Sequence, residues 1–320
     1  MSSTSLDRSD AGADAVADAA HPADTASDAG ALRPGRRLGV GGVGAGVWLG
    51  LVLLGAVLAP WLPVDDPEQV FDLRTGQAIA GPGTDGHLLG GDAIGRDLFA
   101  RVVWGARSSL LLAVGSGVIG LLVGGTLGLV AGYYRGLADT VLSGVFDTLL
   151  SIPAIIRAVA MVAVFAPPDP ARPPTDLRRM TVLVLALGVV SIPIVARIAR
   201  ASALGWSQRE FVLAARVSGA THRRILVQEV LPNVVPAMLS VSLLGIGVVI
   251  VAEGGLSLLG AGVQLPTPSW GNIIFEGQQT IYETPWPVLA PAMAIFLTVV
   301  SLNHLGDVLQ SRFEIRDSGL

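Results

Sequence analysis

The sequence predicts an all-α protein that crosses a membrane six times, and three observations support this fold class. Hydrophobic residues make up 51% of the 320 positions and charged residues only 14%, whereas soluble domains carry roughly 25% charged residues. The mean hydropathy is +0.62. Six charge-poor windows are long enough to cross a hydrocarbon core of roughly 30 Å.

The elements follow in order along the chain. Residues 1–38 are expected to be a disordered cytoplasmic tail, because Ala, Asp, Ser and Thr dominate them and bury too little apolar surface to fold. The first membrane helix is expected over 39–64, followed by an extracytoplasmic segment, 65–107. A core domain, 108–306, and a cytoplasmic C-terminal tail, 307–320, complete the chain. The later membrane helices are expected at 108–134, 140–166, 180–196, 230–252 and 284–303.

One further charge-free window, 254–275, is expected not to span, because five Gly and two Pro interrupt it. It is expected to form a half-helix followed by a loop. Six spans place both termini on one side of the membrane. With the N-terminus inside, 13 Arg fall in cytoplasmic segments and 7 outside. This excess predicts cytoplasmic termini.

The cytoplasmic segment 197–232 is the most informative for function. Ser207 and Glu210 form the S-x-x-E pattern of a capping box, which predicts a helix start. Ser218 and Gly219 end that helix, and Thr221 begins a second one. Leu231, Pro232 and Asn233 are then expected to turn the chain into the fifth span. With Phe211 as an anchor, the first helix either docks in a groove on a partner or is an ordinary interfacial helix.

Composition excludes several functional classes. The chain has no Cys, and its four His are scattered, so neither a zinc motif nor any metal ligation is expected. All 21 basic residues are Arg, so the Lys-containing phosphate loop of an ATPase is absent. No catalytic residues are expected. An intramembrane enzyme would need paired catalytic groups in the spans, and a secondary transporter would need more ionisable groups there or inverted repeats.

The segment 197–232 resembles the coupling loop of ABC importer permeases, which reads Glu-Ala-Ala, three residues, Gly, nine residues, Ile-x-Leu-Pro. This chain has Ala214 and Ala215, then Gly219, then Leu231 and Pro232 at the same spacing. Leu213 replaces the first Glu, as is common in the peptide branch, and Glu229 replaces Ile.

Further stretches resemble the peptide branch, in the family order, between residues 88 and 316. They are "LLGGDAIGRDLFARVVWGARSSL", "GLVAGYYRGLADT", "FDTLLSIPAI", "EGGLSLLGAGVQLPTPSWGNII" and "LNHLGDVLQSRFEIR". Together these motifs are similar to the C-type permease of dipeptide, oligopeptide and nickel ABC importers. The resemblance implies a type I importer permease fold in the cell membrane.

The resemblance also implies partners and a mode of action. It implies a homologous second permease, one or two ABC ATPase subunits, an extracytoplasmic substrate-binding protein and membrane lipid, and no nucleic acid. ATP and Mg²⁺ are expected on the ATPase subunits, with no cofactor on this chain. The implied substrates are peptides, with nickel, oligosaccharides or another small solute as alternatives. The implied ATPase-coupling residues are Glu210, Phe211, Ala214, Ala215, Gly219, Ala220, Leu231 and Pro232.

Three charged residues within the spans are candidates for the translocation path. Asp147 and Arg157 lie in the third window, where an ionised side chain costs roughly 2.5–3.5 kcal/mol and is expected to face protein or water. They either contact the substrate or have structural roles, with Asp147 pairing to another helix and Arg157 reaching the interface. Glu253, at the end of the fifth span, is a gate, a helix-packing anchor or a charge at headgroup level.

Overall fold

The computed structural model describes residues 40–71, 81–83, 86–167 and 176–317. The chain divides into two units, Met1–Arg36 and Arg37–Leu320, and every described residue belongs to the second. The predicted disordered tail, 1–38, lies outside the described residues. Within them, secondary structure is helical apart from two isolated β-bridges, Val70 to Arg96 and Gly91 to Asp97.

Among the described residues, five helices are long and apolar enough to cross a membrane: Gly41–Trp61, Leu98–Tyr134, Leu177–Trp206, His222–Leu258 and Trp286–Gln310. They comprise α1 (Val40–Leu58), α2 (Leu98–Ile119), α3 (Gly125–Tyr134), α6 (Asp176–Trp206), α8 (His222–Arg224), α9 (Leu231–Leu258) and α11 (Trp286–Asp317). The π-helical turns Gly120–Gly124 and Ile225–Val230 join α2 to α3 and α8 to α9, and a 3-10 turn, Ala59–Trp61, follows α1. The remaining helices are α4 (Gly136–Ser151), α5 (Ala154–Phe165), α7 (Glu210–Val217) and α10 (Trp270–Gly277), with a 3-10 turn at Gln278–Thr280. The multi-pass all-α prediction is confirmed.

The third predicted span is not one continuous helix. It consists of α4 and α5, which meet at an angle of 89°. The part of the chain that the structure describes reaches six spans only if this bent pair counts as one. The break follows from Pro153, which has no N–H to continue the helix and forces Ile152 into an extended conformation. Asp147 and Arg157, which fall in one predicted span, therefore lie on two different helices.

Helix ends also differ from the predicted boundaries. α2 begins at Leu98 rather than at 108, because the Asp97 side chain accepts a hydrogen bond from the backbone N–H of Ala100 and caps the helix. α11 continues to Asp317, through most of the predicted C-terminal tail. The segment 254–275 is a half-helix and loop as expected, since α9 ends at Leu258 and α10 begins only at Trp270.

A row of glycines brings two membrane helices into backbone contact. Gly120 and Gly124 in the turn after α2, and Gly128 and Gly132 in α3, lie four residues apart and face α6. A Cβ on Gly124 or Gly128 would collide with a main-chain carbonyl of α6, and one on Gly132 would lie 2.5 Å from the Arg200 carbonyl oxygen. Small residues allow this approach, which drives helix association where the solvent is lipid.

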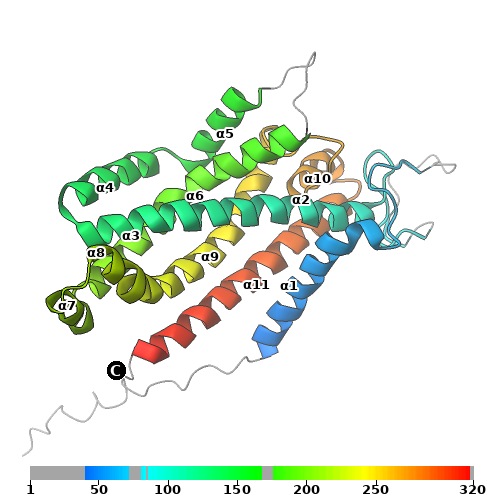
Figure 1. Ribbon diagram of the computed structural model, residues 1–320. Coiled ribbons are helices and arrows are strands. Elements are labelled where there is room, and N and C mark those ends of the chain that lie inside the picture. The colour runs from blue at the N-terminus through cyan, green and yellow to red at the C-terminus, as the bar shows by residue number, and fades with distance from the viewer. Residues whose placement is uncertain (1–39, 72–80, 84–85, 168–175, 318–320) are drawn as a thin grey trace, which may run out of the picture. The chain divides into compact units, whose positions relative to one another are not determined.

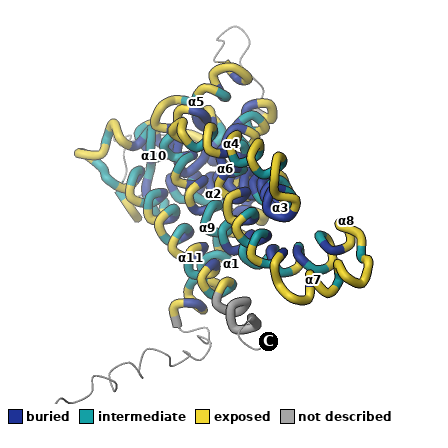
Figure 2. Tube along the Cα trace, turned by 90° about the vertical axis from the view of Figure 1, so that its left-hand side faces the viewer, coloured by how far each residue is buried: buried dark blue, intermediate teal, exposed yellow. Residues whose placement is uncertain are grey.

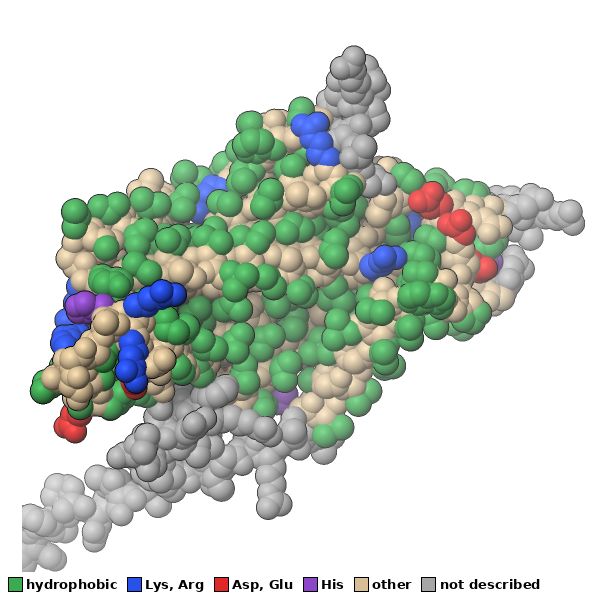
Figure 3. Space-filling model, viewed as in Figure 1, with side chains coloured by type: hydrophobic (Ala, Val, Ile, Leu, Met, Phe, Trp, Pro, Cys, Tyr) green, Lys and Arg blue, Asp and Glu red, His purple; other side chains and the backbone are tan. Residues whose placement is uncertain are grey.

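The helices form a bundle with α6 near its centre (Figure 2). The start of α1, the end of α11 and the α7–α8 segment lie at one end of the bundle, and α10 lies at the other (Figure 1). Hydrophobic side chains cover the long sides of the helices, whereas most charged side chains gather toward the ends (Figure 3). This distribution is the one that a bilayer requires.

Candidate functional site

The candidate coupling element is α7 with the turn that follows it. α7 ends in hydrogen bonds from the N–H groups of Ser218 and Gly219 to the carbonyls of Ala214 and Arg216. Gly219 has a φ of 80°, in the left-handed region that glycine adopts without strain. The Thr221 side chain then accepts a hydrogen bond from Arg224 N–H and caps α8. The predicted order of helix, glycine turn and helix is therefore confirmed.

Two local predictions in this segment are wrong. Ser207 does not cap α7: its hydroxyl donates to the Leu204 carbonyl, and Arg209 takes the N-cap position without a side-chain bond. Leu231 and Pro232 do not turn the chain, because the helix runs on from α8 through a π-helical turn into α9. Pro232 stands in the first turn of α9, where its missing N–H costs little.

Val212 is the most deeply buried residue of α7 and anchors it against the membrane helices. Val212 is fully buried in an apolar cluster with Tyr133 of α3, Ala203 of α6 and Ile225, and Ala215 and Ala220 pack against this cluster. The Trp206 and Phe211 rings lie beside each other, with centroids 6.1 Å apart. Val212 is therefore in one packed cluster with side chains of α3, α6 and α9.

The opposite face of α7 is apolar and exposed. Phe211 is 40% exposed, Leu213 47% and Val217 90%, and Ala214 is also exposed. Figure 2 shows the α7–α8 segment as mostly exposed at the end of the bundle. A cleft of about 510 Å³ opens beside α7, lined by Tyr133, Tyr134, Arg135, Ser207, Gln208, Leu213, Arg216 and His222. An anchored helix with an uncovered apolar face is suited to receive a partner.

Asp147 pairs with another helix, which is the structural role considered for it. Arg197 of α6 donates a hydrogen bond to the Asp147 carboxylate at 2.7 Å, and the two side chains are 60% and 61% exposed. A second bridge joins the same helices, from Arg200 to Asp139. The two ion pairs link α4 to α6, and the Asp147–Arg197 pair remains exposed.

Arg157 lies in α5 and is 9% exposed. Its Nε and Nη1 atoms are buried and have no hydrogen-bond partner among the described residues. Two of its three guanidinium nitrogens are thus buried without a partner among the described residues, and burial of a charged group in this way is costly.

Glu253 is fully buried in α9. Its carboxylate accepts hydrogen bonds from Ser257 and Ser269 at 2.9 and 2.8 Å, and from Ser109 of α2 at 3.4 Å. Ser269 is also the N-cap of α10. The carboxylate thus joins α2, α9 and the start of α10, which favours the packing-anchor alternative for this residue.

Sequence reasoning missed two polar clusters at the end of the bundle that holds α10. Arg179 is buried at the start of α6, and its Nε donates to the Gly262 carbonyl at 3.0 Å. A four-residue network joins Asp92, Arg96 and Arg101 to Glu276 of α10, through contacts of 2.5 to 2.8 Å. No local sequence pattern connects residues 92–101 to position 276.

Opposing effects set the pKa of Asp92. Burial by itself would raise this pKa. The backbone N–H of Arg96 and the positive charges of Arg101 and Arg96 outweigh burial, so the pKa of Asp92 lies below its ordinary value. The carboxylate therefore stays ionised and holds the two arginines at the start of α2.

Comparisons with known proteins agree with this architecture. Residues 124–316 match the family model described as "Binding-protein-dependent transport system inner membrane component". The di/tripeptide transport system permease protein DppC of Pseudomonas aeruginosa (strain UCBPP-PA14) is 34% identical over 276 residues, covering 86% of this chain and 88% of the relative. The glutathione transport system permease protein GsiD of Escherichia coli O1:K1 is 34% identical over 278 residues, covering 86% of each chain.

A solved structure shares the fold. The inward-facing MetNI methionine ABC transporter matches with a TM-score of 0.55 at 19% identity, covering 68% of this chain and 97% of that one. The family model covers more than half of the chain, and the relatives align along most of their length. The described chain is thus a multi-pass membrane permease that belongs to the binding-protein-dependent transport system inner membrane component family.

Proposed function

We propose that this chain is a permease subunit of an ATP-driven ABC importer that takes up short peptides. The named solutes of its relatives support this substrate class, because di- and tripeptides and glutathione are all short peptides. The chain itself binds no ATP. Partner ATPase subunits bind ATP and Mg²⁺ and hydrolyse the nucleotide, and a substrate-binding protein delivers the solute.

The observation that carries the proposal is the exposed apolar face of α7, on the side opposite the face that Val212 anchors to the membrane helices. Phe211, Ala214 and Val217 form the docking surface for the ATPase, with Glu210 at the start of the helix. Val212 connects this surface to the membrane helices. Gly219 and Ala220 form the turn behind it, and Leu231 and Pro232 begin the helix that receives the movement.

The path for the solute lies along α4, α5 and α6. The homologous second permease covers the side of this path that the chain itself leaves open. The exposed Asp147–Arg197 pair faces that path and offers both charges to a zwitterionic peptide. Arg157 supplies a further positive charge from α5. Both termini lie in the cytoplasm, on the side where α7 meets the ATPase.

The test is co-purification of the ATPase with the permease, both expressed with the second permease. Val217→Ser removes an apolar side chain that is 90% exposed. Burying a valine stabilises a complex by about 1.5 kcal/mol, so the affinity for the ATPase should fall by about tenfold. Val70→Ser is the matched control, since Val70 is 55% exposed but lies in the segment between α1 and α2.

The outcomes separate the alternatives. Retention of the ATPase by Val217→Ser at the level of the unmodified chain would remove α7 from the docking surface. If the unmodified chain brings down no ATPase, the protein is an ATPase-independent transporter. A separate experiment tests the substrate class by measuring the binding of peptides, sugars and nickel to the purified substrate-binding protein. Tightest binding of a sugar or of nickel would overturn the peptide assignment.

A further inference from the structure

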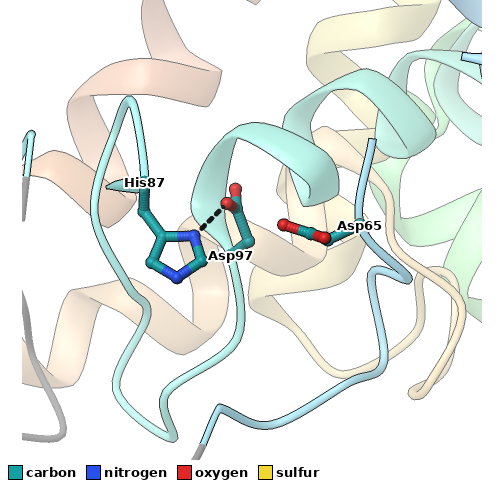
Figure 4. A group of neighbouring side chains, drawn as sticks. All are labelled: Asp65, His87 and Asp97. Atoms are coloured by element: carbon teal, nitrogen blue, oxygen red, sulfur yellow. Dashed lines mark hydrogen bonds and ion pairs between the residues drawn. The ribbon is translucent and has the colours of Figure 1, made fainter. Parts of the chain in front are cut away.

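Three polar side chains from separate parts of the chain converge in the segment between α1 and α2. Asp65 follows the turn after α1, His87 lies in the connecting loop, and Asp97 caps α2 (Figure 4). One ligand-capable atom of each lies within 4.8 Å of those of the other two. The His87 Nδ1 and Asp97 Oδ2 atoms are 2.6 Å apart, and these two side chains are 17% and 8% exposed.

Backbone and ring contacts hold two of these groups in place. The His87 carbonyl accepts hydrogen bonds from Gly83 and Gly90 N–H, and the imidazole lies against the Phe71 ring with centroids 4.2 Å apart. The Asp97 Oδ1 atom accepts a hydrogen bond from the N–H of Ala100, so its Oδ2 atom, which contacts His87 Nδ1, is the one turned toward the cluster. Two ligands are therefore fixed by the fold before any ion binds.

The charge of this cluster is not balanced by arginine. Asp92 lies nearby in sequence and pairs with two arginines. In contrast, no arginine among the described residues forms an ion pair with Asp65 or Asp97. With a neutral imidazole, the two carboxylates leave a charge of about −2, which a divalent cation would neutralise.

We propose that Asp65, His87 and Asp97 bind a divalent transition-metal ion of the zinc class. One imidazole nitrogen and two carboxylate oxygens suit zinc, whereas Ca²⁺ takes six to eight oxygen ligands and Mg²⁺ keeps most of its waters. Ligand atoms at about 2.0–2.1 Å from zinc lie roughly 3.3 Å apart. The 2.6 Å contact must therefore open slightly and the exposed Asp65 side chain must close in.

Three protein ligands leave a fourth, open position, which water fills. The ion would link the residues that follow α1 to the first turn of α2 and so clamp the connecting segment. This inference departs from the expectation that no histidine binds a metal. That expectation rested on the spacing of the four histidines from one another. The other two ligands of this site are instead carboxylates, which come from other parts of the segment between α1 and α2. The proposal holds whatever solute the permease transports.

The experiment measures zinc binding to the full-length chain in detergent, purified without a histidine tag and treated with a chelator. Competition with a fluorescent zinc chelator gives the affinity, with Mg²⁺ and Ca²⁺ as comparison ions. We expect one Zn²⁺ per chain. Loss of a supporting residue around a metal site costs 10–100-fold in affinity, so loss of a ligand in Asp65→Asn or His87→Gln should cost about 100-fold.

Asp66→Asn is the matched control, because Asp66 is also exposed and adjacent but lies outside the cluster. It should bind zinc as the unmodified chain does, and zinc should raise the thermal unfolding midpoint of both by several degrees. Asp65→Asn should fold without zinc and show no such rise, which keeps the test valid if His87→Gln fails to fold. Equal zinc affinity in Asp65→Asn and Asp66→Asn, or no stoichiometric binding to the unmodified chain, would overturn the proposal.

Discussion

The glycine turn behind α7 offers the sharpest test of the coupling model. Gly219 has a φ of 80°, and a Cβ built on it would meet no atom within 4 Å. The cost of Gly219→Ala is therefore conformational, about 1–2 kcal/mol for a left-handed residue with a Cβ. If the turn must hold this conformation when the ATPase docks, the affinity of the permease for the ATPase should fall by about 5- to 30-fold.

A series of substitutions separates backbone strain from bulk and charge. Gly219→Asn should lose less than Gly219→Ala, because asparagine tolerates the left-handed region. Gly219→Asp should abolish uptake while the chain still inserts, since it adds a charge that docking would desolvate. Gly205→Ala is the control: this exposed glycine in the last turn of α6 also has free space at the Cβ but no positive φ.

The assay measures ATPase affinity by biolayer interferometry on the permease in nanodiscs, alongside solute uptake. Insertion is checked by the yield of monodisperse protein. If Gly219→Ala binds the ATPase as the unmodified chain does, the left-handed turn is not required for docking. If Gly219→Asn weakens binding more than Gly219→Ala, side-chain bulk rather than backbone strain is responsible.

Three further predictions concern the bundle. Gly128→Val should prevent recovery of folded permease, because the new side chain would collide with the Ala196 carbonyl; normal yield and thermal stability would contradict this. Asp92→Asn should cost about 3 kcal/mol at pH 7, since it breaks a buried ion pair. The pKa of Asp92 is lowered by folding, so its contribution is complete above the unfolded pKa of about 4 and is lost as pH falls through the lower folded value. Thermal midpoints at pH 7 and 3.5 should therefore differ less in this variant than in the unmodified chain. Asp147→Asn should change stability by under about 1 kcal/mol, because its pair with Arg197 is exposed, yet reduce uptake; an unchanged uptake rate would remove Asp147 from the path.

Local sequence patterns predicted the main features of the fold and of the coupling element. Hydropathy located the membrane helices because burial in lipid demands a long apolar run at each crossing. Helix-forming residues that end at Ser218 and Gly219 located α7 and its turn, although Ser207 is not the cap, since helix propensity and a left-handed glycine are properties of a few adjacent residues. Pro153 was visible in the sequence, but its 89° bend was not recognised within an otherwise apolar window.

The tertiary structure alone decided which distant residues meet. Asp147 lies fifty positions from its partner Arg197, and Glu276 lies far from the arginines that it neutralises. No periodicity encodes such contacts, because they depend on how packed helices set the distances between their side chains. The same holds for Asp65, His87 and Asp97: composition determined that the chain has no cysteine and few histidines, but only the folded connection between α1 and α2 brings these three ligand atoms together.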